Sequence, residues 1–276
     1  MAGVDVDAYF RRIGHDASGA PTLATLRALH RHHPLAIPFE NLTTLIGQTP
    51  PLDAASLQHK MVTTGRGGYC FEQNHLFSAV LRTLGYKVTG LAARVLWERA
   101  DDALTPRTHM LLAVRISGRT YISDVGFGGL TLTAPLLLEP GIEQTTPHET
   151  FRLMSANRGF VLQARLGDEW RSLYWFDLQE HHEIDFEVLN HFVATYPGSP
   201  FPSQLYAART LPDRRLGLRN ERFSVYGLDG SVERTVLADV PAVRSVLMEH
   251  FGLALPADDR LDAALARAIS AAARTP

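Results

Sequence analysis

A lone cysteine occupies a position that favours a reactive thiol. Cys70 follows the flexible residues 66–68 and precedes a run in which Leu76, Val80 and Leu84 recur on one helical face. This pattern predicts a helix whose first turn contains Cys70. The unpaired N–H groups and the positive dipole end of that turn favour a thiolate and can hold an oxyanion. A single cysteine is also often a small buried apolar side chain, so the local context has to decide.

Two strand-like segments supply a base and its partner, since THMLLAVRI contains His109 and RTYISDVGF contains Asp124. A turn centred on Ser117 and Gly118 places Asp124 opposite Leu111, which shares a strand face with His109. The two side chains are then diagonal neighbours roughly 7 Å apart, within reach of a hydrogen bond. With Cys70 they would form a nucleophile, a general base and an orienting carboxylate. Taken singly, a core histidine and a turn aspartate are the simpler interpretation.

A glycine-rich run follows Asp124 and Val125 directly. Gly126-Phe127-Gly128-Gly129 would let the backbone approach a phosphate or a pantetheine chain closely. The run matches neither the P-loop pattern nor the dinucleotide fingerprint, so nucleotide hydrolysis and dinucleotide binding have no support. An ordinary glycine turn is the alternative interpretation.

Histidines gather in two other places, where His30 precedes the segment Arg31-His32-His33 and where His181 precedes His182. Neither group has the H-E-x-x-H spacing or a neighbouring set of cysteines. We therefore expect both groups to lie on solvated faces, and no metal ion is implied.

Five aromatic residues lie in or near these segments. Aromatic side chains are more often core than ligand-binding, but three of the five flank the candidate catalytic and glycine positions. They favour a flat, aromatic substrate pocket. The residues are Phe39, Tyr69, Phe71, Phe127 and Phe201.

The elements that must position these residues fall into three groups and predict an α+β fold. Residues 1–85 read as a helical bundle that bears the nucleophile, broken into short helices by Pro34, Pro38, Pro50 and Pro51. Residues 86–185 carry short alternating runs typical of an antiparallel β-barrel, which would bear the histidine and the aspartate. Residues 186–276 mix the two signals and indicate an α/β unit. Helices are expected near EIDFEVLNHFVATY and LDAALARAISAAAR, and strands near ERFSVYGL and VERTVLA.

Composition excludes several classes of protein. The chain has 276 residues, 45% hydrophobic and 20% charged, as ordinary globular proteins do. Its formal net charge of -2 argues against a nucleic-acid binder. It has no signal-like start and no run of roughly 18 apolar residues, so we expect a cytoplasmic protein without a membrane partner. One cysteine permits neither an internal disulfide nor a Cys-rich zinc cluster.

Four segments together resemble a known family. RGGYCFEQN, THMLLAV and DVGFGG occur in that order, and IPFENL spans residues 37–42. In these motifs the chain is similar to the arylamine N-acetyltransferases, specifically to their bacterial branch. The resemblance covers the N-terminal half and weakens in the last third of the chain.

The resemblance implies a fold and a set of sites. The fold would be a helical bundle, a β-barrel and an α/β lid around a core shared with papain-like and transglutaminase-like enzymes. Cys70 would accept the acetyl group, His109 would act as general base and acid, and Asp124 would orient the imidazole. Acetyl-CoA would be a co-substrate, without any permanently bound cofactor, and would contact Gly126, Gly128, Gly129 and Thr108. The acceptor pocket would be lined by Phe39, Tyr69, Phe71, Phe127 and Phe201.

The implied reaction is a ping-pong transfer from acetyl-CoA, through an acetyl-cysteine, to a small aromatic amine or hydrazine. Two alternatives stay open. The same three side chains could serve a cysteine hydrolase or a transglutaminase-like enzyme, and a CoA-binding scaffold without activity could keep the same fold. The sequence is compatible with either a monomer or a homodimer.

Overall fold

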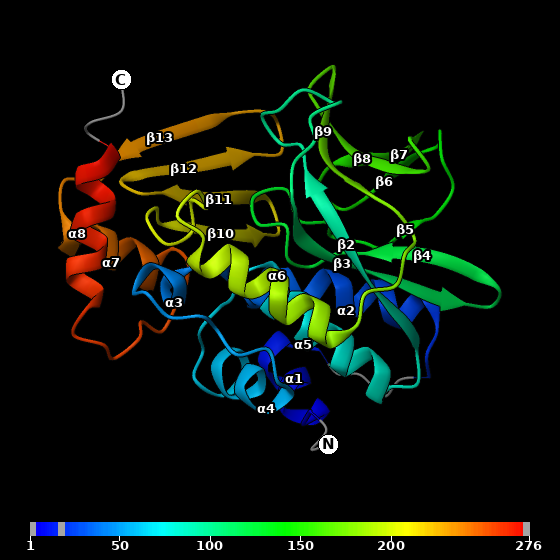
Figure 1. Ribbon diagram of the computed structural model, residues 1–276, viewed down its shortest axis with the longest axis horizontal. Coiled ribbons are helices and arrows are strands. Elements are labelled where there is room, and N and C mark those ends of the chain that lie inside the picture. Colours follow the sequence, from blue (N-terminus) through cyan, green and yellow to red (C-terminus); the bar gives the residue numbers. More distant parts are fainter. Residues whose placement is uncertain (1–3, 16–19, 273–276) are drawn as a thin grey trace.

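Short helices occupy the first third of the chain in the computed structural model, which describes residues 4–15 and 20–272 (Figure 1). Polar side chains begin three of them, since Asp5, Thr22 and Asp53 each accept a hydrogen bond from a backbone N–H of the first turn. The helices are α1 (Val6–Ile13), α2 (Leu23–Ala36), α3 (Leu42–Leu45), α4 (Ala54–Leu57), the π-helix η1 (Gln58–Thr63) and α5 (Cys70–Thr83).

Helix α2 continues past Pro34, so the predicted break at this proline is wrong. A proline ring removes one backbone N–H donor and clashes with the preceding turn, which matters most in the middle of a helix. Pro34 lies in the last turn, and Ile37 N–H still donates to His33 O at 2.8 Å to close the helix beyond it. The cost is therefore limited to a single hydrogen bond.

An eight-stranded antiparallel sheet follows, in the order β5-β4-β3-β2-β9-β8-β7-β6. The Gln144 side chain bonds both the N–H and the carbonyl of Leu137, at 2.8 and 2.9 Å, and so links the two edge strands. The predicted α+β class with a barrel-like antiparallel sheet is confirmed. The strands are β2 (Lys87–Val95), β3 (Arg107–Ile116), β4 (Arg119–Ser123), β5 (Leu136–Leu137), β6 (Glu143–Thr145), β7 (Thr150–Ala156), β8 (Gly159–Leu166) and β9 (Glu169–Phe176).

The predicted register of β3 and β4 is also confirmed. Ser117 and Gly118 have φ of 50° and 78°, the left-handed values that a tight hairpin turn requires. Leu112 therefore lies opposite Ser123, and Asp124 follows immediately beyond the end of β4.

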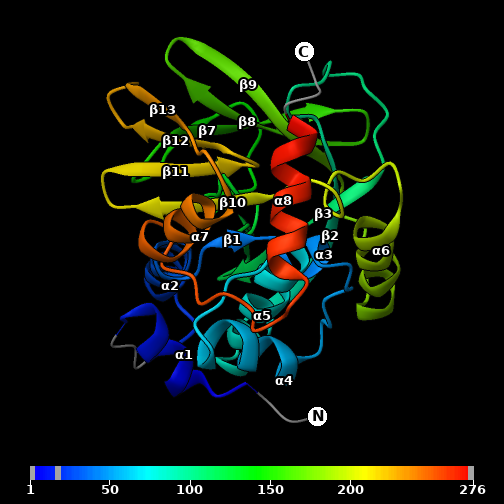
Figure 2. The same cartoon turned by 90° about the vertical axis from the view of Figure 1, so that its left-hand side faces the viewer.

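A second sheet has the order β1-β10-β11-β12-β13, and α7 and α8 pack on one of its faces (Figure 2). Strands β12 and β13 occur at the predicted segments ERFSVYGL and VERTVLA, and both predicted helices are present, as α6 and α8. Elements β1, β10, β11 and α7 were not predicted. The elements are β1 (Phe39–Glu40), α6 (Glu183–Thr195), β10 (Tyr206–Leu211), β11 (Arg214–Arg219), β12 (Arg222–Gly227), β13 (Val232–Val236), α7 (Val240–Glu249) and α8 (Leu261–Ala272). Residues 273 and 274 of the predicted terminal helix lie outside the described residues.

Strand β1 ties the first part of the chain to the last. Phe39 pairs with Ala208 of β10 on one side and bridges to Gly68 on the other. Asn41 adds three hydrogen bonds, donating to the carbonyls of Phe201 and Gln204 and accepting from the N–H of residue 206.

Helix α6 crosses the predicted boundary at residue 185, and the division into three units stays a prediction. Among the described residues, no helix is long and apolar enough to span a membrane.

A buried arginine fastens the second sheet to the barrel. Arg215 on β11 makes two bonds to the carboxylate of Glu149, at 2.6 and 2.7 Å. It also donates to the Thr131 carbonyl at 2.9 Å and to the Thr210 hydroxyl at 3.0 Å. Its side chain is 4% exposed.

We expect Arg215→Met to lower the free energy of unfolding by about 3 kcal/mol, because it leaves a carboxylate and a carbonyl unpaired in a buried place. Urea denaturation followed by circular dichroism measures this loss. Arg214→Met is the matched control, since the Arg214–Asp213 pair is exposed and its loss should leave the midpoint unchanged. Equal urea midpoints for the two variants would show that Arg215 does not stabilise the contact between the second sheet and the barrel.

Candidate active site

Cys70 is the first residue of α5, as predicted, and its side chain is buried with 5% of its surface exposed. The preceding backbone N–H, of Tyr69, donates to the Glu72 carboxylate at 3.1 Å and so closes the start of the helix. The Cys70 Sγ faces the Thr108 carbonyl at 3.6 Å. Thr108 thus lies beside the thiol through its main chain, and its predicted contact with CoA stays a prediction.

His109 and Asp124 meet as the strand register predicts. The imidazole Nε2 lies 2.7 Å from Asp124 Oδ2, and both side chains are buried. Asp124 accepts three more hydrogen bonds, from the Tyr174 hydroxyl at 3.0 Å, from Asn74 Nδ2 at 3.0 Å and from the Gly126 N–H at 2.9 Å. Burial opposes its charge, but His109, Asn74 and the Gly126 N–H hold the pKa of Asp124 below its usual value.

The pair changes the acid–base behaviour of His109. Burial lowers the pKa of the imidazole, but the charge and hydrogen bond of Asp124 outweigh it, and the Cys70 sulfur acts in the same direction. The resulting pKa of His109 is about 10. Because Nε2 is held by Asp124, Nδ1 is the nitrogen left for the thiol. The arrangement can therefore take a proton from Cys70 and hold it.

Three further side chains support this site, and none of them was predicted to do so from the sequence. Asn74 joins α5 to the barrel, donating to the Met110 carbonyl at 2.8 Å as well as to Asp124. Asn74 lies four residues after Cys70 on the same helical face, a spacing that could have indicated it. Tyr174 comes from β9 and His30 from α2, and no local pattern connects either of them with Asp124.

His30 and His33 are fully buried, so the predicted solvated face is wrong for these two residues. They lie three apart on the inner face of α2, against the Phe77 ring. His30 Nε2 accepts the N–H of Asp124 at 3.1 Å, and burial lowers the pKa of this ring to about 4, which keeps it neutral. His181 and His182 do lie towards the surface. Among the described residues, no group of three or more His, Cys, Asp or Glu side chains could hold a metal ion.

The three predicted glycines have different surroundings. A Cβ on Gly126 would lie 2.9 Å from the Cys70 Cα, so this position needs glycine for the loop to touch α5. Gly128 has φ of 92° and packs on the Phe39 ring, and Gly129 is exposed with open space beside it. The predicted contacts with CoA stay a prediction.

The predicted aromatic residues form two groups near the thiol. The Phe201 ring centre lies 6.4 Å from that of Phe39 and 5.7 Å from that of Tyr69, which in turn contacts Phe71. Phe127 packs edge-on against His109 at 5.2 Å. Phe39, Phe127 and Phe201 keep exposed surface, whereas Tyr69 and Phe71 are fully buried. Only the first three therefore keep surface that another molecule could contact, and the substrate contacts of all five stay a prediction.

Comparison with known proteins decides the family. The family model described as N-acetyltransferase matches residues 22–260. The arylamine N-acetyltransferase of Escherichia coli (strain K12) is 44% identical over 246 residues, covering 89% of this chain and 87% of that protein. The solved structure of the arylamine N-acetyltransferase from M. tuberculosis is 42% identical, with a TM-score of 0.91 over 95% of this chain and all of the other. This chain belongs to the arylamine N-acetyltransferase family.

The resemblance predicted from the motifs, including that to bacterial members, is thereby confirmed. The arylamine N-acetyltransferase of Mycobacterium marinum has been solved in complex with CoA. That structure is 40% identical to this chain, with a TM-score of 0.91, and covers 96% of this chain and 99% of the other.

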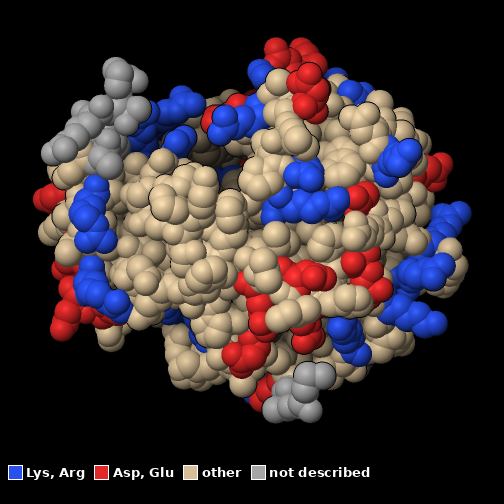
Figure 3. Space-filling model, viewed as in Figure 1, with Lys and Arg blue, Asp and Glu red and all other residues tan. Residues whose placement is uncertain are grey.

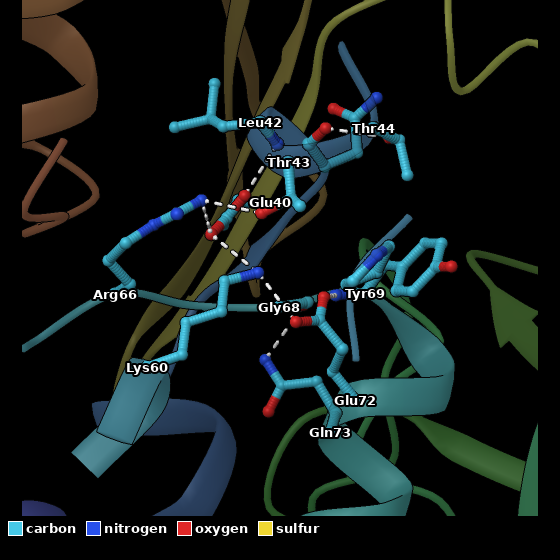
Figure 4. A network of polar contacts seen from close by, with 12 residues as sticks. Glu40, Leu42, Thr43, Thr44, Lys60, Arg66, Gly68, Tyr69, Glu72 and Gln73 are labelled. Atoms are coloured by element: carbon cyan, nitrogen blue, oxygen red, sulfur yellow. Dashed lines mark hydrogen bonds and ion pairs between the residues drawn. The ribbon is translucent and has the colours of Figure 1, made fainter. Parts of the chain in front are cut away.

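Two buried carboxylates and two partly buried cations lie behind the start of α5 in this arylamine N-acetyltransferase family member (Figure 4). Lys60 Nζ is 2.7 Å from Glu72 and 3.4 Å from Glu40, and Arg66 is 2.8 Å from Glu40. Glu40 Oε2 accepts the N–H of Leu42 at 2.6 Å, as Glu72 accepts that of residue 69. The two carboxylates therefore hold the backbone directly after β1 and directly before the thiol.

The pKa values of Glu72 and Glu40 shift in opposite directions. Burial raises the pKa of Glu72, and the nearby Lys60 only partly reverses this, so the pKa of Glu72 stays raised. Burial also opposes the charge of Glu40, but Lys60 and Arg66 together lower its pKa below the usual value. Lys60 is thus the cation that both carboxylates share.

We expect Lys60→Met to destabilise the fold more at pH 8 than at pH 5. Without Lys60 the folded-state pKa of Glu72 moves further above the unfolded value of about 4.3, so stability falls as the pH rises between these values. Urea unfolding should show a loss of about 1 kcal/mol at pH 5 and about 3 kcal/mol at pH 8. Lys87→Met, on the exposed start of β2, should change neither value. A loss that does not depend on pH would contradict this assignment.

Proposed function

We propose that this protein transfers an acetyl group from acetyl-CoA to the nitrogen of an arylamine or arylhydrazine, through an acetyl-Cys70 intermediate. One observation carries the proposal: the thiol begins a helix beside an imidazole whose far nitrogen is held by a buried carboxylate. Family membership and the CoA complex of the M. marinum relative support the choice of donor.

The proposed first half-reaction acetylates the enzyme. Cys70 gives its proton to His109, and the sulfur attacks the carbonyl carbon of the thioester. Backbone N–H groups in the first turn of α5 stabilise the charge that develops on the carbonyl oxygen. The carbon–sulfur bond to CoA then breaks, and CoA leaves with the proton that His109 returns.

The second half-reaction releases the product. The acceptor nitrogen attacks the acetyl carbon, His109 removes its proton, and the bond to Cys70 breaks. The sulfur leaves as a thiolate beside the protonated His109, ready for the next cycle. An aniline-type nitrogen is uncharged at neutral pH and attacks without first losing an ammonium proton. The exposed surfaces of Phe39, Phe127 and Phe201 offer its ring apolar contact next to the thiol.

Incubation with acetyl-CoA and no acceptor should add the mass of one acetyl group to the peptide containing Cys70, measured by mass spectrometry. Adding aniline should remove that mass and release acetylaniline, because nitrogen attack completes the cycle. Cys70→Ala should gain no acetyl group. Rapid release of acetate at a rate that aniline does not change would favour a hydrolase. An unmodified Cys70 would contradict the proposal.

Asp124→Asn should lower kcat/KM for acetyl transfer by about 10³-fold, because an amide neither fixes the imidazole tautomer nor stabilises its charge. The pKa of His109 should fall with it, so alkylation of Cys70 by iodoacetamide should slow between pH 6 and pH 8. Asp168→Asn, in an exposed turn of the barrel, should leave both rates unchanged. Full activity of the Asp124→Asn variant would show that the Asp124 carboxylate has no role in the mechanism.

A further inference from the structure

Asn190 on the inner face of α6 joins two segments close to the thiol. Its side chain is buried, with Oδ1 accepting the hydroxyl of Tyr69 and Nδ2 donating to the carbonyl of Pro50 at 2.9 Å. The outer face of α6 lies at the molecular surface, with acidic side chains gathered over its first turns (Figure 3). Asn190 therefore directs its amide into the protein, towards the residue that precedes Cys70.

The hydroxyl of Tyr69 is a buried donor that depends on this amide. Tyr69 is fully buried, and within the described part of the chain Asn190 is the only hydrogen-bond partner of its hydroxyl. Burial raises the pKa of Tyr69 well above its usual value, so the hydroxyl keeps its proton and stays a donor. Because a buried donor without an acceptor is unfavourable, the bond to Asn190 fixes the direction of the Tyr69 ring.

The backbone of Tyr69 is held by other partners. Its N–H donates to the Glu72 carboxylate at 3.1 Å, and its carbonyl accepts the N–H of Gln73 at 3.0 Å. Neither of these bonds involves α6. Loss of Asn190 would therefore free the ring of Tyr69 but leave the start of α5, with Cys70, in place.

The Tyr69 ring supports an aromatic wall that has exposed surface near the thiol. Phe201 meets this ring edge-on, with ring centres 5.7 Å apart and planes inclined by 76°. Phe201 also contacts Phe39, and both phenylalanines keep exposed surface. Since an edge-on contact depends on the directions of both rings, a turn of Tyr69 would move Phe201 as well.

We propose that Asn190 is a positioning residue for the acceptor, because it holds, through the Tyr69 hydroxyl, the Phe201 ring against which the ring of an arylamine packs. This inference rests on the proposed function and concerns its second half-reaction alone. Acceptors with and without an aromatic ring should therefore respond differently to the loss of Asn190.

The test compares aniline with hydrazine, an acceptor that has no ring, in acetyl transfer by the full chain. In a ping-pong reaction, kcat/KM for each substrate depends only on the half-reaction in which that substrate takes part. Asn190→Leu should lower kcat/KM for aniline about tenfold, because the ring of the acceptor loses its alignment with acetyl-Cys70. The values of kcat/KM for hydrazine and for acetyl-CoA should stay within about twofold of those of the unmodified protein.

A second variant tests the same contact from the other side. Tyr69→Phe removes the hydroxyl but keeps the ring, so it should cause the same loss with aniline, and it serves alone if circular dichroism shows that Asn190→Leu does not fold. The double variant should lose no more than the larger of the two single losses, because both changes break one hydrogen bond. His191→Leu, on the exposed side of α6, is the matched control and should change none of these values.

Equal losses with aniline and hydrazine, an unchanged kcat/KM for aniline, or fully additive losses in the double variant would each overturn the role of Asn190. These results leave the proposed function intact if acetyl-Cys70 still forms in the unmodified protein. Absence of acetyl-Cys70 there would contradict the proposed function and this inference with it.

Discussion

A carboxylate without access to water is the constraint on which this fold depends. Asp124 keeps its charge because His109, Tyr174, Asn74 and a backbone N–H all donate to it. A buried charge that lost one of these partners would cost several kcal/mol. The donors come from β3, β9, α5 and the loop after β4, so the barrel and the helices can dock in only one relative position. The geometry of the thiol follows from that docking.

The parts of the site that could be predicted from sequence are those set by short-range rules. A two-residue turn fixes the pairing of two adjacent strands, and this pairing is sufficient to predict the contact between His109 and Asp124. The helical pattern after residue 70 predicts Cys70 in the first turn of α5 for the same reason. In both cases the spacing along the chain determines the position in space.

The remaining partners could not be predicted because they depend on distant segments. Tyr174 reaches Asp124 only because β9 pairs with β2, next to β3. No local sequence pattern predicts this order of strands. The polar character of His30 favoured a solvated face, but tertiary packing on Phe77 and one backbone N–H outweighed that preference. The two-residue strand β1 is too short to leave a periodic signal.

The pairing of β1 with both Gly68 and β10 has a consequence for synthesis of the protein. Residues from three widely separated parts of the chain must be present before the backbone ahead of Cys70 has its final neighbours. On the ribosome, the N-terminal helices emerge long before β10, so the thiol completes its surroundings only when translation is nearly finished. Nascent chains and truncated fragments without β10 therefore lack one of the two partners of β1 and cannot complete the backbone arrangement ahead of Cys70.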